Sequence, residues 1–182
     1  MNGDWKQKEI NNNTMPFSLK NKSAIITGAA SGIGLAISTV FAGAEAHVCM
    51  LDLNLEALNN AKTTILRQHP NASISTYQCN VTNEEEVKKA FNQVVDKFGR
   101  LDCLVNNAGI SAVGTVLETT KEEMDRVYNV NVIGVFYGLK HGVRHMLSDG
   151  KGGAIVNLAS IASLIGLADR FAYHMTKGAV LT

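Results

Sequence analysis

The sequence predicts a doubly wound α/β fold, in which helices cover both faces of a parallel sheet to make three layers. Short apolar runs that suit buried strands recur along the chain, and segments with the helical spacing of apolar residues lie between them. Strands that are apolar on both faces need cover on both sides, which amphipathic helices between them provide. The expected strands are residues 24–26, 47–51, 74–79, 103–105 and 154–158.

The first strand leads directly into a glycine-rich loop, Thr27-Gly28-Ala29-Ala30-Ser31-Gly32-Ile33-Gly34, which opens a helix. Glycines here let the backbone turn tightly and approach a pyrophosphate, whose charge then lies at the positive helix N-terminus. The spacing is GxxxGxG, not GxGxxG, and the GK[ST] of a nucleoside triphosphate loop is absent. The loop therefore indicates a dinucleotide site, and the alternative is an ordinary structural turn.

Asp52 ends the second strand, 18 residues beyond Gly34. A carboxylate at this place can accept both ribose hydroxyls of an adenosine and would repel a 2′-phosphate. No Arg or Lys occupies position 31 or lies beside Asp52 in the sequence to attract such a phosphate. The pattern favours NAD over NADP as the cofactor. The alternative is that Asp52 caps a helix that begins near Asn54.

The clearest helix is expected over residues 82–98. Thr82 and Glu85 are expected to form a capping box at its start, and Gly99 stands just past its end, where glycine is favoured. The apolar residues of this segment follow the i, i+3, i+4, i+7 pattern: Val87, Ala90, Phe91, Val94, Val95 and Phe98.

A second helix, over residues 122–147, has apolar residues all round its helical wheel. Such a helix needs cover on every side, so one face is expected on the sheet and the other against a partner subunit. The alternative is a helix buried within a larger monomer. The expected assembly is therefore a homo-oligomer, a dimer or tetramer.

The composition supports one globular domain: 46% of the 182 residues are apolar and 18% are charged. With 17 Lys and Arg against 16 Asp and Glu, charge gives no reason to expect a nucleic acid or an anionic membrane as partner. No uninterrupted apolar run approaches the roughly eighteen residues of a transmembrane helix, so no membrane association is expected. Nor does the N-terminus resemble a secretory signal.

Residues 1–17 are rich in asparagine and lack periodicity, so they are expected to form a flexible tail before a single dinucleotide-binding domain over residues 18–182. The three cysteines, Cys49, Cys79 and Cys103, are widely spaced and form no CxxC pair. They are expected to be small buried hydrophobic residues in a reducing compartment, which indicates the cytoplasm.

Five signals together resemble the short-chain dehydrogenase/reductase family, in its single-domain, NAD-preferring branch. They are the TGxxxGIG run from Thr27, the tetrapeptide 106–109 (Asn-Asn-Ala-Gly), Asn131, Ser160 and the YxxxK pair Tyr173 and Lys177. The resemblance runs from about Phe17 to Thr182. It implies a Rossmann-like sheet of strand order 3-2-1-4-5, and further strands beyond Thr182, without which the domain is C-terminally incomplete.

Without those strands, the fifth strand is expected to form a hydrophobic edge, and the chain by itself is expected to lack the parts that close the pocket.

The residue chemistry supports proton transfer by Tyr173. Tyr173 and Lys177 are one helical turn apart and share a face. A free tyrosine exchanges protons poorly near neutrality, and a nearby ammonium favours the phenolate, so the tyrosine can act as acid and base. Ser160 would hold the substrate oxygen by a hydrogen bond. The resemblance implies that Lys177 also binds the nicotinamide ribose and that Asn131 supports a proton-relay water.

The resemblance also implies the residues that contact the cofactor. Most family members have Asp at the position of Asn80. The amide oxygen of Asn80 can still accept a hydrogen bond from the adenine amino group. Glu45 stands where the family commonly has Gly, at a modest local cost. The implied cofactor contacts are Gly28, Ser31, Gly32, Ile33, Gly34, Asp52, Asn80, Val81, Asn107, Ala108, Gly109, Tyr173 and Lys177.

The predicted function is an NAD-dependent oxidoreductase that interconverts a secondary alcohol and a ketone by hydride transfer with tyrosine acid/base catalysis. One alternative is a 3-oxoacyl-carrier-protein reductase that uses NADPH, and another is a non-catalytic nucleotide-binding or scaffold protein. No metal is expected, because His141 and His145 suit a solvated helix face. A Ser160–His174 hydrolase is disfavoured because GxSxG is missing. Small or apolar residues are expected to border an uncharged substrate: Ser111, Ala112, Val113, Leu164, Ile165 and Gly166.

Overall fold

The computed structural model describes residues 17–148 and 150–182, so the expected tail over residues 1–17 lies almost wholly outside the described residues. Five parallel strands form one sheet in the order β3-β2-β1-β4-β5, which is the order that the family resemblance implies. Each strand lies within one residue of its expected bounds. The strands are β1 (Ser23–Thr27), β2 (His47–Asp52), β3 (Ser73–Gln78), β4 (Cys103–Asn106) and β5 (Ala154–Asn157).

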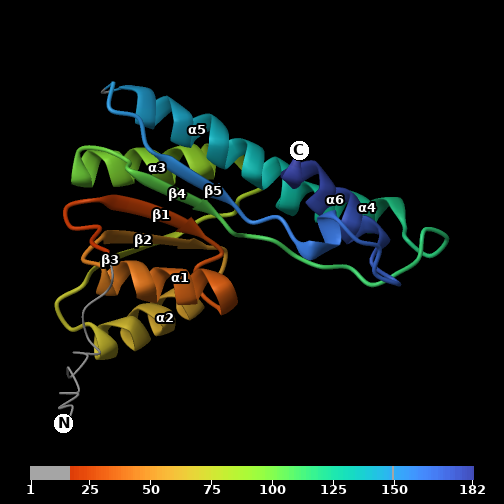
Figure 1. Ribbon diagram of the computed structural model, residues 1–182, viewed down its shortest axis with the longest axis horizontal. Helices are drawn as coiled ribbons and strands as arrows, with labels where there is room; N and C mark the ends of the chain where they lie inside the picture. The colour runs from red at the N-terminus through yellow and green to blue at the C-terminus, as the bar shows by residue number, and fades with distance from the viewer. Residues whose placement is uncertain (1–16, 149) are drawn as a thin grey trace, which may run out of the picture.

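Helices cover both faces of this sheet, so the three layers are confirmed (Figure 1). Helices α1 (Gly32–Gly43) and α2 (Leu55–Gln68) lie on one face, and α3 (Glu84–Phe98) and α5 (Gly134–Ser148) lie on the other. Side chains alternate along each strand, so Ile26 of β1 joins the core under α1 and α2, whereas its neighbour Ile25 joins the core under α3 and α5.

The order of the strands creates a crevice at their carboxyl ends. Strand β1 pairs in parallel with β2 on one side and with β4 on the other. The chain therefore leaves β1 and β4 toward opposite sides of the sheet, which is the place where doubly wound folds bind ligands. The remaining helices, α4 (Lys121–Tyr128) and α6 (Phe171–Leu181), lie beyond this end of the sheet (Figure 1).

The N-terminal cap of α3 differs from the expected one. Helix α3 begins at Glu84, and the side chain of Asn83, not Thr82, accepts from the N–H groups of Glu85 and Glu86. Thr82 is diverted because its N–H and hydroxyl both donate to the side-chain oxygen of Asn80. The expected end is confirmed, since Gly99 has a left-handed φ of 80° and its N–H donates to Val95.

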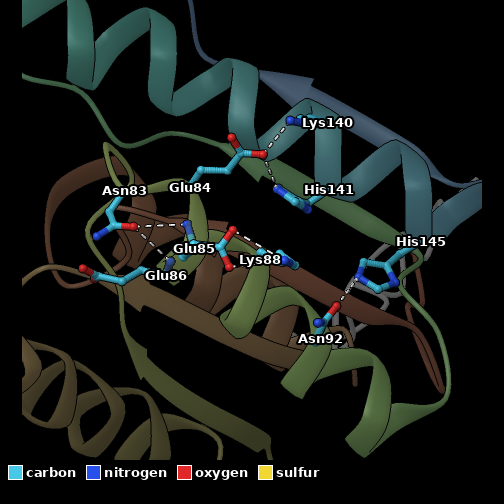
Figure 2. Close-up of polar contacts among 9 residues, drawn as sticks. All are labelled: Asn83, Glu84, Glu85, Glu86, Lys88, Asn92, Lys140, His141 and His145. Atoms are coloured by element: carbon cyan, nitrogen blue, oxygen red, sulfur yellow. Dashed lines mark hydrogen bonds and ion pairs between the residues drawn. The ribbon is translucent and has the colours of Figure 1, made fainter.

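Charged groups join α3 to α5, as Figure 2 shows. The Glu84 carboxylate contacts Lys140 Nζ at 2.6 Å and His141 Nε2 at 3.3 Å, and the hydrogen bond from Lys140 lowers the pKa of Glu84. His145 Nε2 lies 3.0 Å from the amide oxygen of Asn92. His141 is 2% exposed, so the expectation of a solvated face is wrong for this histidine. His145 is only partly buried, and it also contacts the neighbouring helix.

The expected helix over residues 122–147 consists of three consecutive segments. Helix α4 passes into a π-helical turn, η1 (Asn129–Ile133), which continues into α5. One side lies on the sheet, as expected. The other side exposes large apolar residues: Tyr128, Phe136, Val143 and Leu147. The partner subunit expected against this side stays a prediction.

Small residues let α5 lie close to the sheet. Gly134, Gly138 and Gly142 are spaced four apart, so they share the buried face of the helix. A Cβ atom on Gly138 would stand 2.1 Å from the side-chain oxygen of Asn106, and one on Gly142 would stand 2.6 Å from Leu104. The helix can approach β4 this closely only without side chains at these positions.

Two further expectations concern exposure. Cys49 and Cys79 are buried in the core, as expected, and burial raises the pKa of each thiol to about 12, whereas Cys103 is only partly buried. Strand β5 is an edge of the sheet with Val156 about half exposed, as expected for a hydrophobic edge. Within residues 17–148 and 150–182, no helix has the length and apolar character needed to cross a membrane.

The close approach of α5 predicts the effect of an alanine at position 138. Gly138→Ala should lower the free energy of unfolding by about 1–3 kcal/mol, because the new methyl group must displace Asn106 or the helix. Gly178→Ala is the matched control, since a Cβ on this α6 glycine would meet nothing within 4 Å. The control should be neutral or stabilising by up to about 1 kcal/mol. Urea unfolding measures both, and equal effects would contradict the packing argument.

Candidate functional site

A cleft of about 410 Å³ opens at the carboxyl ends of the strands. Its lining brings together the glycine-rich loop, the end of β2, the segment after β4, the segment after β5 and helix α6. Ten of the thirteen implied cofactor contacts line this one cleft: Gly28, Ser31, Gly32, Ile33, Asp52, Asn107, Ala108, Gly109, Tyr173 and Lys177.

The glycine-rich loop exposes the N-terminus of α1 at this cleft. Ser31 is the N-cap of α1 but makes no side-chain capping bond, and the first turn holds no acidic residue. Gly28 has a φ of 64°, and a Cβ on Gly34 would stand 2.2 Å from the Gly28 carbonyl oxygen. The loop therefore needs glycine at both places, and its positive helix terminus is open to an anionic group.

Asp52 stands at the rim of the cleft, beside this loop. One carboxylate oxygen accepts from the N–H of Ala30 at 3.1 Å, and the other accepts from the N–H of Asn54 at 3.1 Å. Asn54, not Asp52, caps helix α2, because its side chain accepts from Ala57. The alternative in which Asp52 is that cap is therefore wrong, although Asp52 does brace the turn before the helix.

Hydrogen bonds tie the end of β4 to the start of the glycine-rich loop. The Asn107 side chain donates to the carbonyl oxygens of Thr27 at 2.8 Å and Gly28 at 3.1 Å. The Thr27 hydroxyl oxygen in turn accepts from the N–H groups of Asn107 and Ala108, both at 3.0 Å. These bonds fix the floor of the cleft.

A second hollow of about 190 Å³ adjoins the cleft and shares Gly28, Asp52, Ala108 and Gly109 with it. Asn80 and Val81 line this hollow, as the family resemblance implies for residues near the adenine. The amide oxygen of Asn80, however, already accepts from the N–H and hydroxyl of Thr82. The oxygen expected to meet an adenine amino group is thus engaged within the chain.

Helix α6 presents Tyr173 and Lys177 to the cleft from one face. Lys177 Nζ lies 5.9 Å from the centre of the Tyr173 ring and donates to the Leu158 carbonyl oxygen at 2.6 Å. Lys177 is 5% exposed, and burial lowers the pKa of its ammonium group. The positive charge is therefore held beside the tyrosine by the segment that follows β5.

Ser160 stands next to the cleft without being part of its lining. It is the N-cap of a short 3₁₀ helix, η2 (Ile161–Ser163), where its hydroxyl oxygen accepts from the Ala162 N–H at 3.1 Å. Ser163 connects this turn to α6, because its hydroxyl donates to the Lys177 carbonyl oxygen at 2.7 Å. Within residues 17–148 and 150–182 the Ser160 hydroxyl proton has no acceptor, so it can donate to another oxygen.

Asn131 lies behind the cleft, fully buried in the π-helical turn. Its amide oxygen accepts from the Ile110 N–H at 2.8 Å, and its amide nitrogen donates to the Ile110 carbonyl at 2.9 Å and the Thr176 hydroxyl at 3.0 Å. One side chain thus fastens the segment after β4 to the helix that carries Tyr173 and Lys177.

Three groups of this site were not predicted from the sequence: the hydroxyls of Thr27 and Thr176 and the carbonyl of Leu158. Thr27 begins the glycine-rich run and Thr176 lies between Tyr173 and Lys177, so their positions in these motifs were a possible signal. The Leu158 carbonyl gave no signal in the sequence, because every residue has a carbonyl. Of the residues expected at the substrate side, Ser111 lines the cleft, whereas Ala112 is buried against Val127 and Ala172. Three other residues of that set have exposed apolar side chains: Val113, Leu164 and Ile165.

The comparisons with known proteins agree with this geometry. The family model described as short chain dehydrogenase matches residues 22–182. The chain is 41% identical over 164 residues to 2-(R)-hydroxypropyl-CoM dehydrogenase of Xanthobacter autotrophicus, and this alignment covers 88% of this chain and 65% of that protein. It is 37% identical over 170 residues to (+)-borneol dehydrogenase 2 of Salvia officinalis, in an alignment that covers 92% of this chain and 59% of that protein.

Solved structures show the same likeness. Levodione reductase superposes with a TM-score of 0.85 at 31% identity, over 89% of this chain and 63% of that one. A short-chain dehydrogenase/reductase of Burkholderia phymatum in complex with NAD superposes with a TM-score of 0.85 at 30% identity, over 91% of this chain and 58% of that one. The chain thus spans less than two thirds of the length of these relatives.

The contacts of Asn131 predict a loss of stability when they are removed. Asn131→Ala should lower the free energy of unfolding by about 2–3 kcal/mol, because the partly buried N–H and carbonyl of Ile110 and the buried Thr176 hydroxyl lose a partner. Asn129→Ala, in the same turn but exposed, is the control and should change it by less than about 0.5 kcal/mol. Urea unfolding of both variants measures the difference, and a loss as small as that of the control would refute the buried clamp.

Proposed function

Because the chain belongs to the short-chain dehydrogenase/reductase family, a family of oxidoreductases that bind nicotinamide cofactors, we propose that it serves an NAD-dependent interconversion of a secondary alcohol and a ketone. One observation carries the proposal. A single cleft joins an open helix N-terminus, a carboxylate at the rim and a tyrosine–lysine pair, which are the groups that such a reaction needs.

The residues present suit NAD. The uncapped N-terminus of α1 and the glycines of its loop can receive the pyrophosphate. Asp52 has carboxylate lone pairs left for ribose hydroxyls, and its charge would repel a 2′-phosphate. Lys177 is the one Lys or Arg among the described residues that line the cleft, and it lies at the other end, beside Tyr173. This charge pattern supports NAD over NADP.

When bound, the nicotinamide accepts or supplies the hydride. Tyr173 exchanges the proton with the substrate oxygen, as base for the alcohol and as acid for the ketone. The Lys177 ammonium, held by Leu158, stands beside that tyrosine and can also bind the nicotinamide ribose. The free hydroxyl proton of Ser160 stabilises the charge that develops on the substrate oxygen.

We assign Asn131 a positioning role in place of direct support for a relay water. Its amide oxygen and both hydrogens of its amide nitrogen already have partners within the chain. Its effect on the reaction therefore passes through Ile110 and Thr176. Thr176 is the residue before Lys177, and its hydroxyl donates to the Tyr173 carbonyl at 2.9 Å, so this chain of bonds sets the position of the catalytic helix.

An uncharged substrate suits the mouth of the cleft. The residues expected to border the substrate include Val113, Leu164 and Ile165, whose exposed side chains are apolar and offer no ion pair to an anionic or cationic group. Two relatives are named as dehydrogenases of a hydroxypropyl compound and of borneol, which fits an alcohol substrate. A cytoplasmic location and an assembly through the exposed side of α4 and α5 are further parts of this proposal.

The acid/base role predicts the result of removing one hydroxyl. In the protein that carries this chain, Tyr173→Phe should lower kcat for alcohol oxidation by about 10²-fold or more. Its affinity for NAD, measured by calorimetry, should stay within about twofold. Tyr128→Phe, a change at an exposed tyrosine of α4, should leave both quantities unchanged. Turnover by Tyr173→Phe at the rate of the unaltered protein would refute the acid/base role of Tyr173. If the unaltered protein turned over none of the alcohols and ketones tried, the non-catalytic scaffold protein would be favoured.

The charge of Asp52 predicts the cofactor preference. NAD should raise the melting temperature of the chain at concentrations where NADP does not, because a ligand that binds the folded state stabilises it. Asp52→Asn should reduce the ratio of the NAD affinity to the NADP affinity by on the order of tenfold, since the repulsion between the carboxylate and the 2′-phosphate is removed. Asp125→Asn, at an exposed surface carboxylate, should leave it unchanged. Tighter binding of NADP by the unaltered chain would support the 3-oxoacyl-carrier-protein reductase instead.

A further inference from the structure

Two loops flank the substrate side of the cleft, and a short backbone bridge joins them. One loop follows β4 and the other connects β5 to α6. The Gly114 N–H donates to the Asp169 carbonyl at 3.0 Å, and the Phe171 N–H donates to the Gly114 carbonyl at 3.2 Å. Asp169 adopts a left-handed φ of 55°, which a residue other than glycine adopts at a cost and only where its surroundings hold it.

The tip of the second loop has a separate attachment. Nε2 of His174 accepts a hydrogen bond from the Leu167 N–H at 3.2 Å. Among the described residues, this is the one hydrogen bond that holds the segment 166–168 to the rest of the chain. His174 directly follows Tyr173 on α6, so the loop tip is fastened to the helix that carries the catalytic pair.

The fastened loop carries exposed apolar side chains. Leu164, Ile165 and Leu167 are 71%, 50% and 43% exposed, and they belong to the same connection as Ser160. This connection begins at Leu158 and Ala159, which line the cleft, so a loop that lay farther from α6 would carry these side chains with it. The reacting groups would stay in place, because Lys177 and Tyr173 are held by Leu158, Ser163 and Thr176.

We propose that His174 is a positioning residue that sets substrate affinity: its unprotonated Nε2 holds the loop tip at Leu167 so that the apolar side chains of residues 164–167 cover the substrate. The inference rests on the proposed function, since it concerns the same cleft. It separates two tasks on α6. Tyr173 and Lys177 act on the substrate oxygen and cofactor, whereas His174 acts on the remainder of the substrate through the loop.

Two substitutions at position 174 test this role. His174→Gln keeps an acceptor near the place of Nε2, whereas His174→Leu removes it. In the protein that carries this chain, the Leu variant should raise KM for the best uncharged secondary alcohol about fivefold, the effect of one lost hydrogen bond. Its kcat and its affinity for NAD should stay within about twofold, and the Gln variant should match the unaltered protein.

Hydrogen exchange of the chain itself gives a second readout that needs no turnover. Peptides that contain the Leu167 amide should exchange about tenfold faster in His174→Leu than in the unaltered chain or His174→Gln. Met175→Leu, at an exposed neighbour on α6, should change neither exchange nor KM. Unchanged exchange in the Leu variant, identical effects of Leu and Gln, or a fall in kcat with KM unchanged would each overturn the role of His174. Absence of turnover in every protein, with the exchange pattern intact, would instead refute the proposed function.

Discussion

The candidate site depends first on the hydrogen bonds that join the carboxyl ends of β1 and β4. Thr27 and Asn107 exchange backbone and side-chain bonds across this junction, and Asn107 also reaches Gly28. Because the two strands are neighbours from which the chain departs in opposite directions, their ends would otherwise leave polar groups without partners. The bonds instead close the floor of the cleft and place the glycine-rich loop, and with it the open N-terminus of α1.

The other half of the site depends on buried polar groups that reach across long stretches of sequence. Lys177 is held by a carbonyl after β5, and Asn131 links Ile110 to Thr176. Each such contact must be satisfied, because a buried group without a partner is costly. The contacts therefore leave α6 one position relative to the sheet. The position of the tyrosine–lysine pair is fixed because contacts from several segments, and not α6 alone, determine it.

The same molecule also separates rigid and adaptable parts. The close contact of α5 with β4 needs glycine at positions 138 and 142, and charged groups at Glu84, Lys140 and His141 join α5 to α3. These contacts fix the two helices on one face of the sheet. The substrate side consists of two loops joined by one backbone bridge, and His174 fastens the tip of one of them, which carries exposed apolar side chains, to α6. A fold arranged in this way can keep its chemistry constant while its loops determine what binds.

Much of this protein could be predicted from sequence, because its signals are local. Apolar runs placed every strand within one residue, and the loop 27–34, Asp52 and the spacing of Tyr173 and Lys177 predicted the composition of the cleft. The family resemblance supplied the strand order. Tertiary structure alone decided the rest: Thr82 lost the capping role to Asn83, the Asn80 oxygen was engaged, His141 was buried, and Asn131 became a clamp. A short polar side chain has many partners of similar energy along its own sequence, and only the folded chain determines which of them lies within hydrogen-bond distance.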